Sequence, residues 1–538
     1  MTNPESAPVL IVGGGPSGAV QALALARQGI RSIVVERATT VSQAPKAHAI
    51  NPRSLEICRT LGIDVIRIRE TAARPVDVGR VWYTTRLNGP AFGYLPYERQ
   101  DDAAYALTPT PLVNIPQPEL EDIILAAVAR RSDLIDFRRA HAWVSLEQDA
   151  DGVTATIDGP AGRYAVRSRY LIAADGAASS VREAAGIRMV GEDNVLAALS
   201  ISFTADLRRI VADKGGVLYW LNDPAVRGTF IAYHPERLWS YVTIHPAGMI
   251  DMSRYTEAAC RDMVIAAIGE EVPDLRVAAI VPWTMRSEVA ERYSSGRVHL
   301  VGDAAHRFPP TGGLGLNTGI GDAHNLAWKL AGVLNGWAKT DIIDSYEAER
   351  RPVAIRNADQ SLENARNLAA LQALECPEEI WREGDRFEAW MAEDDRAGRI
   401  GQAVERQREH FNSISLQLGF SYAEAYGAAD DVQTFVPRAD PGFRMPHAWL
   451  ARDGKRISTL DLLDPTAFTL VVGAPGWPIP ETPVPLRVVD VSQLRFETDW
   501  RRLVKIEERG ALLVRPDGHI VERIADGATL ERALAVLR

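Results

Sequence analysis

Short apolar runs that end in glycine or an acidic residue alternate with Ala- and Leu-rich segments near the start of the chain. Residues 9–12 form a continuous apolar run before Gly13, which is typical of a buried parallel strand. Residues 19–28 predict a helix, and residues 32–35 predict a second strand that ends at Glu36. The order strand, helix, strand therefore predicts an α/β domain that opens with a βαβ unit.

The turn between the first strand and the helix has the glycine spacing of a dinucleotide site. Gly13 makes the tight turn, Gly15 lets the backbone approach a pyrophosphate, and Gly18 allows close packing of helix on strand. The helix N-terminus attracts phosphate groups. Glu36 lies 18 residues past Gly18, where an acid can accept hydrogen bonds from ribose hydroxyls. Further expected contacts of this region are Pro16, Ser17 and Arg37.

Two later apolar runs also end in acidic motifs. One leads into Asp175-Gly176, and the other leads into Gly302-Asp303, which is followed by a loop rich in glycine and proline at residues 308–317. A carboxylate at a strand end can accept hydrogen bonds from sugar-like hydroxyls. The structural alternative for Asp303 is a helix N-cap, a position that Asp also favours.

These three motifs, in this order, resemble the class A flavoprotein monooxygenases, the aromatic hydroxylases related to p-hydroxybenzoate hydroxylase and phenol hydroxylase. The resemblance runs from about residue 9 to residue 352, with a weaker one in the C-terminal region, and is greatest for the phenol and chlorophenol hydroxylases. It implies a non-covalent FAD, with NADPH or NADH as a transient reductant. It also implies that a flavin C4a-hydroperoxide, formed with O2, hydroxylates a phenolic aromatic substrate.

The resemblance assigns the ADP half of FAD to the first glycine turn and Glu36. The other implied cofactor-binding residues are Arg53, Gln117, Asp175, Gly176, Gly302, Asp303, Pro310, Gly313, Gly315, Leu316 and Asn317. Glycines in the loop let backbone N–H groups approach the flavin edge. The helix expected over about residues 318–334 would direct its positive end at the flavin. Pro310 is also placed among the catalytic residues, because its carbonyl is implied to face the carbon that reacts with oxygen.

His48 is the main candidate for the group that removes the substrate proton. The resemblance places it where phenol hydroxylase has an active-site Asp and where chlorophenol-type members have His. An imidazole with a pKa near 6.5 suits proton removal from a phenol at neutral pH. The alternative is a histidine that packs against the flavin pocket without transferring a proton. His306 is expected to be structural, and Arg286 and Arg307 to be surface residues.

Residues 189–289 have a different pattern, with period-2 alternation and many aromatic and β-branched residues. Strands are predicted over 196–204, 216–221, 228–233 and 238–244. An antiparallel sheet of this kind would form the substrate pocket. Most of its aromatic residues are expected in the core, because alternation turns only one face toward a ligand. These residues are Tyr219, Trp220, Phe230, Tyr233, Trp239 and Tyr241.

The predicted fold is α/β, with a Rossmann-like FAD-binding domain, an inserted antiparallel β-sheet substrate domain and a C-terminal thioredoxin-like domain. The FAD-binding domain covers residues 1–188 and 285–365, with about 75–100 contributing to the substrate domain at 189–284. A helical linker over 366–440 leads to the thioredoxin-like domain at 441–538. No cysteine follows Cys376, so dithiol chemistry is excluded there and a structural or subunit-contact role is expected.

Composition limits which partners, metal sites and cellular locations are expected. The 538 residues carry a formal charge of −10, which argues against nucleic acid as a partner. No apolar stretch approaches the roughly 20 residues of a membrane helix, and the start lacks the basic region of a signal peptide. Three cysteines far apart predict neither a disulfide framework nor a zinc site. We expect a cytoplasmic protein without a metal, which binds a small aromatic substrate, O2 and NAD(P)H and forms a homodimer.

Other functions remain open on this fold. The same parts would serve hydroxylation, epoxidation or Baeyer–Villiger oxidation of a larger polycyclic natural product. A flavin halogenase or an FAD-dependent dehydrogenase is a second alternative, although residues 476–480 lack the second Trp of the halogenase motif and lie in the wrong domain. A non-catalytic flavin-binding protein is the third.

Overall fold

A mostly parallel sheet carries all three nucleotide motifs. In the computed structural model, which describes residues 4–42, 44–98, 100, 102–423, 431–506 and 510–536, its strand order is β16–β17–β10–β1–β2–β7. The strands are β16 (Ser294–Ser295), β17 (Val298–Leu300), β10 (Gly162–Ala173), β1 (Glu5–Val12), β2 (Ser32–Glu36) and β7 (Ile135–Arg139). Neighbours from β17 to β7 are parallel. The carboxyl ends of β2, β1, β10 and β17 therefore meet at one edge, where open α/β sheets bind ligands.

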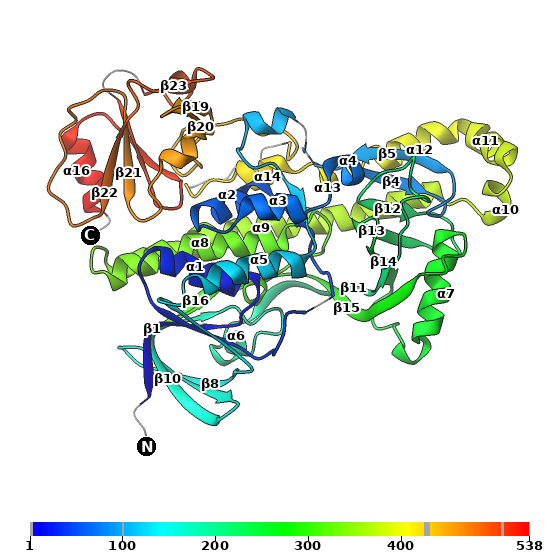
Figure 1. Ribbon diagram of the computed structural model, residues 1–538, viewed down its shortest axis with the longest axis horizontal. Helices are drawn as coiled ribbons and strands as arrows, with labels where there is room; N and C mark the ends of the chain where they lie inside the picture. Colours follow the sequence, from blue (N-terminus) through cyan, green and yellow to red (C-terminus); the bar gives the residue numbers. More distant parts are fainter. Residues whose placement is uncertain are drawn as a thin grey trace.

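Helices cover this sheet because β2 and the C-terminal halves of β1 and β10 are apolar and buried. α1 (Pro16–Arg27) follows β1. Both α8 (Gly315–Leu334) and α5 (Gln117–Ala129) pack against α1 (Figure 1). A methyl group on Gly18 would lie 2.0 Å from the carbonyl oxygen of Gly13, so only glycine allows this approach of helix to strand. The predicted helix and strands of the opening unit are confirmed. α8 begins three residues earlier than the predicted 318.

A second, largely antiparallel sheet has the order β18–β15–β11–β14–β13–β12–β4–β5. Its strands are β18 (His306–Arg307), β15 (Arg276–Ala290), β11 (Met189–Thr204), β14 (Leu238–His245), β13 (Gly228–His234), β12 (Leu218–Leu221), β4 (Arg80–Thr84) and β5 (Ala91–Pro96). The four predicted strands are confirmed within β11 to β14. The sequence pattern did not predict β15, which crosses residue 285, or α7 (Glu257–Ile268), whose buried residues join the core of this sheet.

The two faces of this sheet have different neighbours. Tyr219, Phe230, Trp239 and Tyr241 are buried in one core with α7, so the expectation that most of these aromatic residues are core is confirmed. Trp220, at the next position of β12, instead packs in the cluster on the opposite face. Alternation along the strands therefore divides the aromatic residues between two environments.

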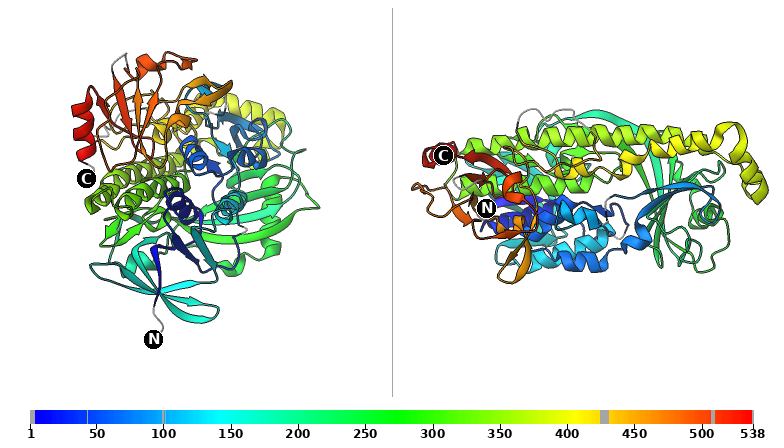
Figure 2. Two further views of the ribbon diagram at one scale, coloured as in Figure 1. Left: turned by 60° about the vertical axis from the view of Figure 1, so that its left-hand side comes forward. Right: turned by 90° about the horizontal axis from the view of Figure 1, so that it is seen from above.

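Helices after residue 343 cover that opposite face. α9 (Asp344–Asn367) runs beside α8 along the long axis, and the shorter helices continue beyond it (Figures 1 and 2). Apolar side chains of residues 368–411 form one cluster with β4, β5 and β12. The shorter elements are η5 (Leu368–Leu374), α10 (Glu378–Trp381), α11 (Gly384–Ala392), α12 (Arg396–Glu405), α13 (Arg408–Phe411) and α14 (Ile414–Leu418).

The C-terminal part has its own sheet and core at the other end of the molecule (Figure 1). The order is β22–β21–β24–β25, in which β21 pairs with β22 in parallel and the other pairs are antiparallel. This mixed sheet with a terminal helix fits the predicted thioredoxin-like domain. Its elements are β21 (Phe468–Val472), β22 (Leu486–Asp490), β24 (Ala511–Val514), β25 (Ile520–Ile524) and α16 (Gly527–Ala535).

The described residues contain neither a helix that could span a membrane nor a cluster of metal-ligating side chains. None of their helices combines the length and apolar character needed to cross a bilayer. Their His, Cys, Asp and Glu side chains also form no group that could hold a metal ion.

Candidate flavin and substrate site

The first glycine turn is closely packed at Gly13 and Gly18 and open at Gly15. Gly13 has φ +105° and donates its N–H to the carbonyl of Val35 at 2.8 Å, which ties the turn between β1 and α1 to the end of β2. A methyl group on Gly15 would meet nothing within 4 Å, so the backbone there is open to a phosphate group. Glu36 accepts the N–H of Gly14 and of Ala38, each at 2.7 Å, and so shapes the turn. Its contact with ribose stays a prediction.

The Gly302-Asp303 motif lies against this turn. Gly302 has φ +62°, and a methyl group on it would lie 2.4 Å from the Ser17 hydroxyl oxygen. The Asp303 carboxyl keeps exposed surface but is surrounded by protein, and this burial raises its pKa despite the positive charges of Lys46 and Arg307. Asp303 does not act as an N-cap, because Val301 holds that position of the short 3-10 helix. A carboxylate in this setting suits the hydroxyls of a ribityl chain.

Asp175 has a more local role. Its carboxylate accepts hydrogen bonds from the Ser179 hydroxyl at 2.5 Å and from the N–H of Val181 at 3.1 Å, which supports the start of α6 (Ser180–Ala184). Burial nevertheless raises the pKa of Asp175. Contacts of Asp175 and Gly176 with FAD and NAD(P)H stay predictions.

Asn317 joins the predicted flavin loop to the segment that carries His48. Its side-chain carbonyl accepts the N–H of Asn51 at 3.0 Å, and its side-chain NH2 donates to the carbonyls of Ala49 at 2.9 Å and Gly313 at 2.7 Å. Gly313 is needed here, because it has φ +63° and an added methyl would lie 3.1 Å from the Ala49 side chain. The structure therefore brings the loop, the N-terminus of α8 and the His48 segment together.

His48 is held in one orientation beside the second sheet. Its Nδ1 lies 2.9 Å from the side-chain carbonyl oxygen of Asn114, so Nδ1 carries the proton and Nε2 is the basic nitrogen. Its ring stacks with Tyr97 at 6.2 Å between centroids and meets Tyr233 edge-on at 5.7 Å. Burial lowers the pKa of His48, and the bond to Asn114 offsets only part of this. The imidazole is neutral at pH 7 and can accept a proton.

The remaining predicted cofactor residues lie around these elements. Gln117 is hydrogen-bonded to the His48 segment, because its side-chain carbonyl accepts the N–H of Ala47 at 3.3 Å. Its side-chain NH2 donates to Glu121 at 2.6 Å. Arg53 points instead to the C-terminal domain, where it donates to the Asp517 carbonyl at 2.6 Å. Pro310 and Arg37 are exposed, and Pro16, Gly315 and Leu316 are half-buried. The flavin contacts of these residues stay predictions.

A buried ion pair on α8 and α9 holds the Gly302-Asp303 motif through the N–H of Gly302. Asp322 of α8 accepts the N–H of Gly302 at 3.2 Å, His306 Nε2 lies 2.8 Å from it, and Arg350 donates to it at 2.8 Å. All three side chains are almost inaccessible to solvent. Burial opposes ionisation of Asp322, but Arg350 and His306 hold its pKa low. These contacts support the structural role predicted for His306. Asp322 itself was missed, and an acid on the helix after the Gly-Asp loop was the available signal.

A second ionic cluster connects α8 and α9 to the C-terminal domain. Glu349 pairs with Lys329 at 2.8 Å and with Arg515 at 2.7 Å, and Arg515 also donates to Asp517 at 2.5 Å. Trp328 donates its indole N–H to the same Asp517 at 3.1 Å. The C-terminal domain is therefore fixed to the nucleotide-binding domain through buried charges, which supports its predicted structural role.

Arg286 and Arg307 both have acidic partners. Arg286 pairs with Asp193 at 2.6 Å, and Arg307 pairs with Glu288 at 3.1 Å. The structure thus gives each arginine a local ion pair, although Arg307 is largely buried and not a surface residue as expected.

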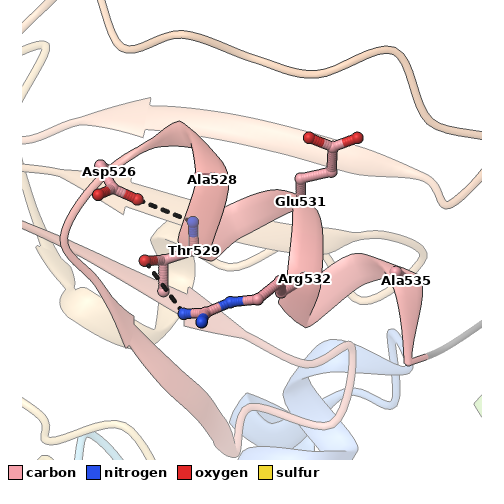
Figure 3. Close-up of a pocket in the computed structure, with 6 residues that line it drawn as sticks. All are labelled: Asp526, Ala528, Thr529, Glu531, Arg532 and Ala535. Atoms are coloured by element: carbon pink, nitrogen blue, oxygen red, sulfur yellow. Dashed lines mark hydrogen bonds between the residues drawn. The ribbon is translucent and has the colours of Figure 1, made fainter.

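Two further pockets lie away from these motifs. One of about 430 Å³ follows α16 and is lined only by residues of that helix and its cap, including Asp526, Thr529 and Arg532 (Figure 3). A larger one of about 710 Å³ lies between the β17 edge and α9. Neither contains a predicted site residue.

The glycine turn, the two acidic motifs and the loop before α8 together define a dinucleotide-binding flavoprotein. Residues 6–361 match the FAD binding domain family, and residues 438–537 match the aromatic-ring hydroxylase C-terminal family. The chain belongs to the FAD-dependent aromatic-ring hydroxylases, as the sequence motifs predicted. It binds FAD and is a flavoprotein monooxygenase.

The chain is similar to known proteins over nearly its whole length. The 2,4-dichlorophenol 6-monooxygenase of Delftia acidovorans is 33% identical, with 96% of this chain and 94% of the relative covered. The tetracenomycin A2 monooxygenase-dioxygenase of Streptomyces glaucescens is also 33% identical, with 96% and 93% covered. The flavin-dependent monooxygenase PieE, solved with FAD and substrate, has a TM-score of 0.89 and 33% identity, with 98% and 99% covered.

Proposed function

We propose that this monooxygenase hydroxylates a phenolic ring, with NADH or NADPH as reductant and O2 as oxidant. The observation that carries the proposal is the placement of His48. It is a neutral, oriented imidazole next to aromatic side chains, on the segment that Asn317 fastens to the flavin loop. A phenol must lose its proton to become a strong nucleophile, and this arrangement provides an acceptor.

The chain's own groups divide the work. When bound, FAD supplies the redox and oxygen chemistry. The open backbone at Gly15 would hold its phosphates, and Asp303 its ribityl hydroxyls. The N-terminus of α8 would stabilise negative charge on the flavin ring. His48 Nε2 takes the phenol proton while Asn114 keeps the ring oriented, and the apolar cluster of residues 368–411 keeps water from the substrate face.

Substitution of the histidine tests the role directly. For His48→Ala we expect hydroxylation to fall by about 10²–10⁴-fold, because general-base assistance is lost. Uncoupled NAD(P)H oxidation with peroxide release should rise. Both are measured by comparing product mass with peroxide and NAD(P)H consumed.

His245→Ala is the matched control. That imidazole interacts with the Thr243 hydroxyl on β14, and its removal should leave coupling unchanged. Unchanged hydroxylation and coupling in His48→Ala would contradict the role of His48 as a base.

A polycyclic substrate is the second candidate. The relatives at 33% identity are named for substrates of both sizes, a dichlorophenol and a tetracenomycin. A panel of single-ring and fused-ring phenols, read by substrate-stimulated NAD(P)H oxidation and product mass, separates the two. Stimulation by fused-ring phenols alone would establish the polycyclic alternative.

A further inference from the structure

Glu98 has an unusual backbone for its residue type. It follows β5 and has φ +46°, a left-handed conformation that favours glycine. Its N–H donates to the carbonyl of Phe411 at 2.6 Å, so α13 fixes this conformation from the other side. A non-glycine residue held in this way is a recognised sign of a functional constraint.

The carboxyl of Glu98 is largely enclosed by protein and has no paired cation among the described residues. Its oxygens accept hydrogen bonds from the side-chain NH2 of Gln417 at 3.1 Å, from the Ser413 hydroxyl at 3.4 Å and from the Ser413 backbone, and all of these donors are neutral. Among the described residues, no Lys, Arg or His forms an ion pair with it. Burial raises the pKa of Glu98 to about 7. An acid in this setting is costly unless a further hydrogen-bond donor reaches it.

Several other buried acids form ion pairs. Glu56 pairs with Arg444, Asp322 with Arg350, and Glu349 with Arg515. Burial raises the pKa of Asp303, as it does for Glu98, and Asp303 belongs to a cofactor motif. Glu98 therefore differs from the ion-paired acids and shares its raised pKa with Asp303 and Asp175, both of which belong to predicted cofactor motifs. Its side chain also keeps some accessible surface.

Glu98 is the next residue after a wall of the proposed substrate site. The Tyr97 ring stacks with His48, and it also packs against Phe411 at 6.1 Å between centroids. The negative charge of Glu98 helps raise the pKa of Tyr97, so the carboxyl lies within electrostatic range of that phenol. A ring that places one hydroxyl at His48 would thus have a second polar position beside Tyr97.

We propose that Glu98 is a specificity-determining residue that accepts a hydrogen bond from a second hydroxyl of the aromatic substrate, which is therefore a dihydroxy or polyhydroxy arene. The inference rests on the proposed hydroxylation of phenols and deepens it. A carboxylate substituent at the same place would be repelled. The second hydroxyl would add a donor to those of Gln417 and Ser413.

The ionisable groups around Glu98 predict how recognition depends on pH. Burial lowers the pKa of His410 to about 3 and also lowers that of His48, so both are neutral near pH 7. Tyr97 stays protonated, because burial raises its pKa. Of these four described groups, Glu98 is the one that titrates near pH 7, because burial raises its pKa to about 7. Affinity for a dihydroxy arene should weaken as pH falls below about 7, whereas that for a monohydroxy arene should not.

The test compares Glu98→Gln with the wild type on a matched pair of substrates, a monohydroxy and a dihydroxy arene of the same ring skeleton. The dissociation constant of each is measured from the flavin absorbance of the FAD-loaded enzyme without reductant, and KM and kcat are measured with NAD(P)H. We expect about tenfold weaker binding of the dihydroxy arene, since a charged acceptor is replaced by a neutral one, and less than twofold change for the other. The pH dependence near 7 should disappear.

Gln417→Leu separates recognition from architecture. It removes a neutral partner of Glu98 but keeps the carboxyl, so it should retain the preference for the dihydroxy arene. Equal weakening of both substrates by Glu98→Gln, or no change in either, would overturn the inference. So would failure of the wild type to bind the dihydroxy arene more tightly. If binding follows the expected pattern but neither arene is hydroxylated, the proposed function fails while the assignment of Glu98 stands.

Discussion

Asp303, which precedes the loop that leads into α8, and Asp322, which lies within α8, have opposite surroundings. Asp322 is enclosed by Arg350, His306 and the N–H of Gly302, and these contacts hold its pKa low. Asp303 is exposed and forms no ion pair among the described residues, and desolvation by the surrounding protein raises its pKa. The difference teaches that the presence of a paired cation decides in which direction the pKa of a carboxyl shifts, and it predicts that Asp303, unlike Asp322, is available to a ligand.

Arg350→Met should give the largest effect. It leaves the Asp322 carboxylate buried without its main counter-charge, and breaking such a pair costs about 3–5 kcal/mol. We expect the free energy of unfolding of the FAD-loaded protein to fall by that amount, measured by urea denaturation. Arg286→Met is the control, because its pair with Asp193 is partly exposed and should contribute less than about 1 kcal/mol. Equal losses in the two variants would abolish the distinction between the acids.

Acid should weaken the cluster that joins the C-terminal domain. Although burial opposes ionisation of Glu349, Arg515 and Lys329 hold its pKa at about 2. An unfolded Glu titrates near 4.3, so the folded state binds this proton less readily. The stabilisation is present above about pH 4.3 and is lost as pH falls toward 2. We expect unfolding free energies measured across this range to decline, and Glu349→Gln to flatten the decline. An unchanged slope in that variant would assign the acid sensitivity to other groups.

Asp303→Asn should change binding more than folding. The carboxylate is predicted to accept charge-assisted hydrogen bonds from ribityl hydroxyls, worth about 1.5–3 kcal/mol, so FAD should bind roughly 10–150-fold more weakly. Stability of the FAD-free protein should stay within about 0.5 kcal/mol, since no described ion pair is broken. Titration of apoprotein with FAD and thermal unfolding measure the two quantities. A loss of stability comparable to that in Arg350→Met would place Asp303 with the structural acids.

Much of the fold follows from local pattern. The βαβ unit, the four strands of the second sheet and the thioredoxin-like strands were predictable, because alternation and apolar runs report burial directly. β15 was missed because its polar and apolar residues do not alternate cleanly. The interface between α8, α9 and the C-terminal domain was also out of reach. Lys329, Glu349 and Arg515 lie far apart in sequence, and no local rule pairs them.

The sequence by itself determined the class of enzyme, its cofactor and the residues of the glycine turn, since these depend on short motifs with fixed spacing. It also proposed His48, but not the bond to Asn114 that selects its basic nitrogen. Only the tertiary structure decided which acids are paired and which are open. Pairing depends on distances between elements that are remote in the chain, and in a low-dielectric interior those distances set the charge state of each group.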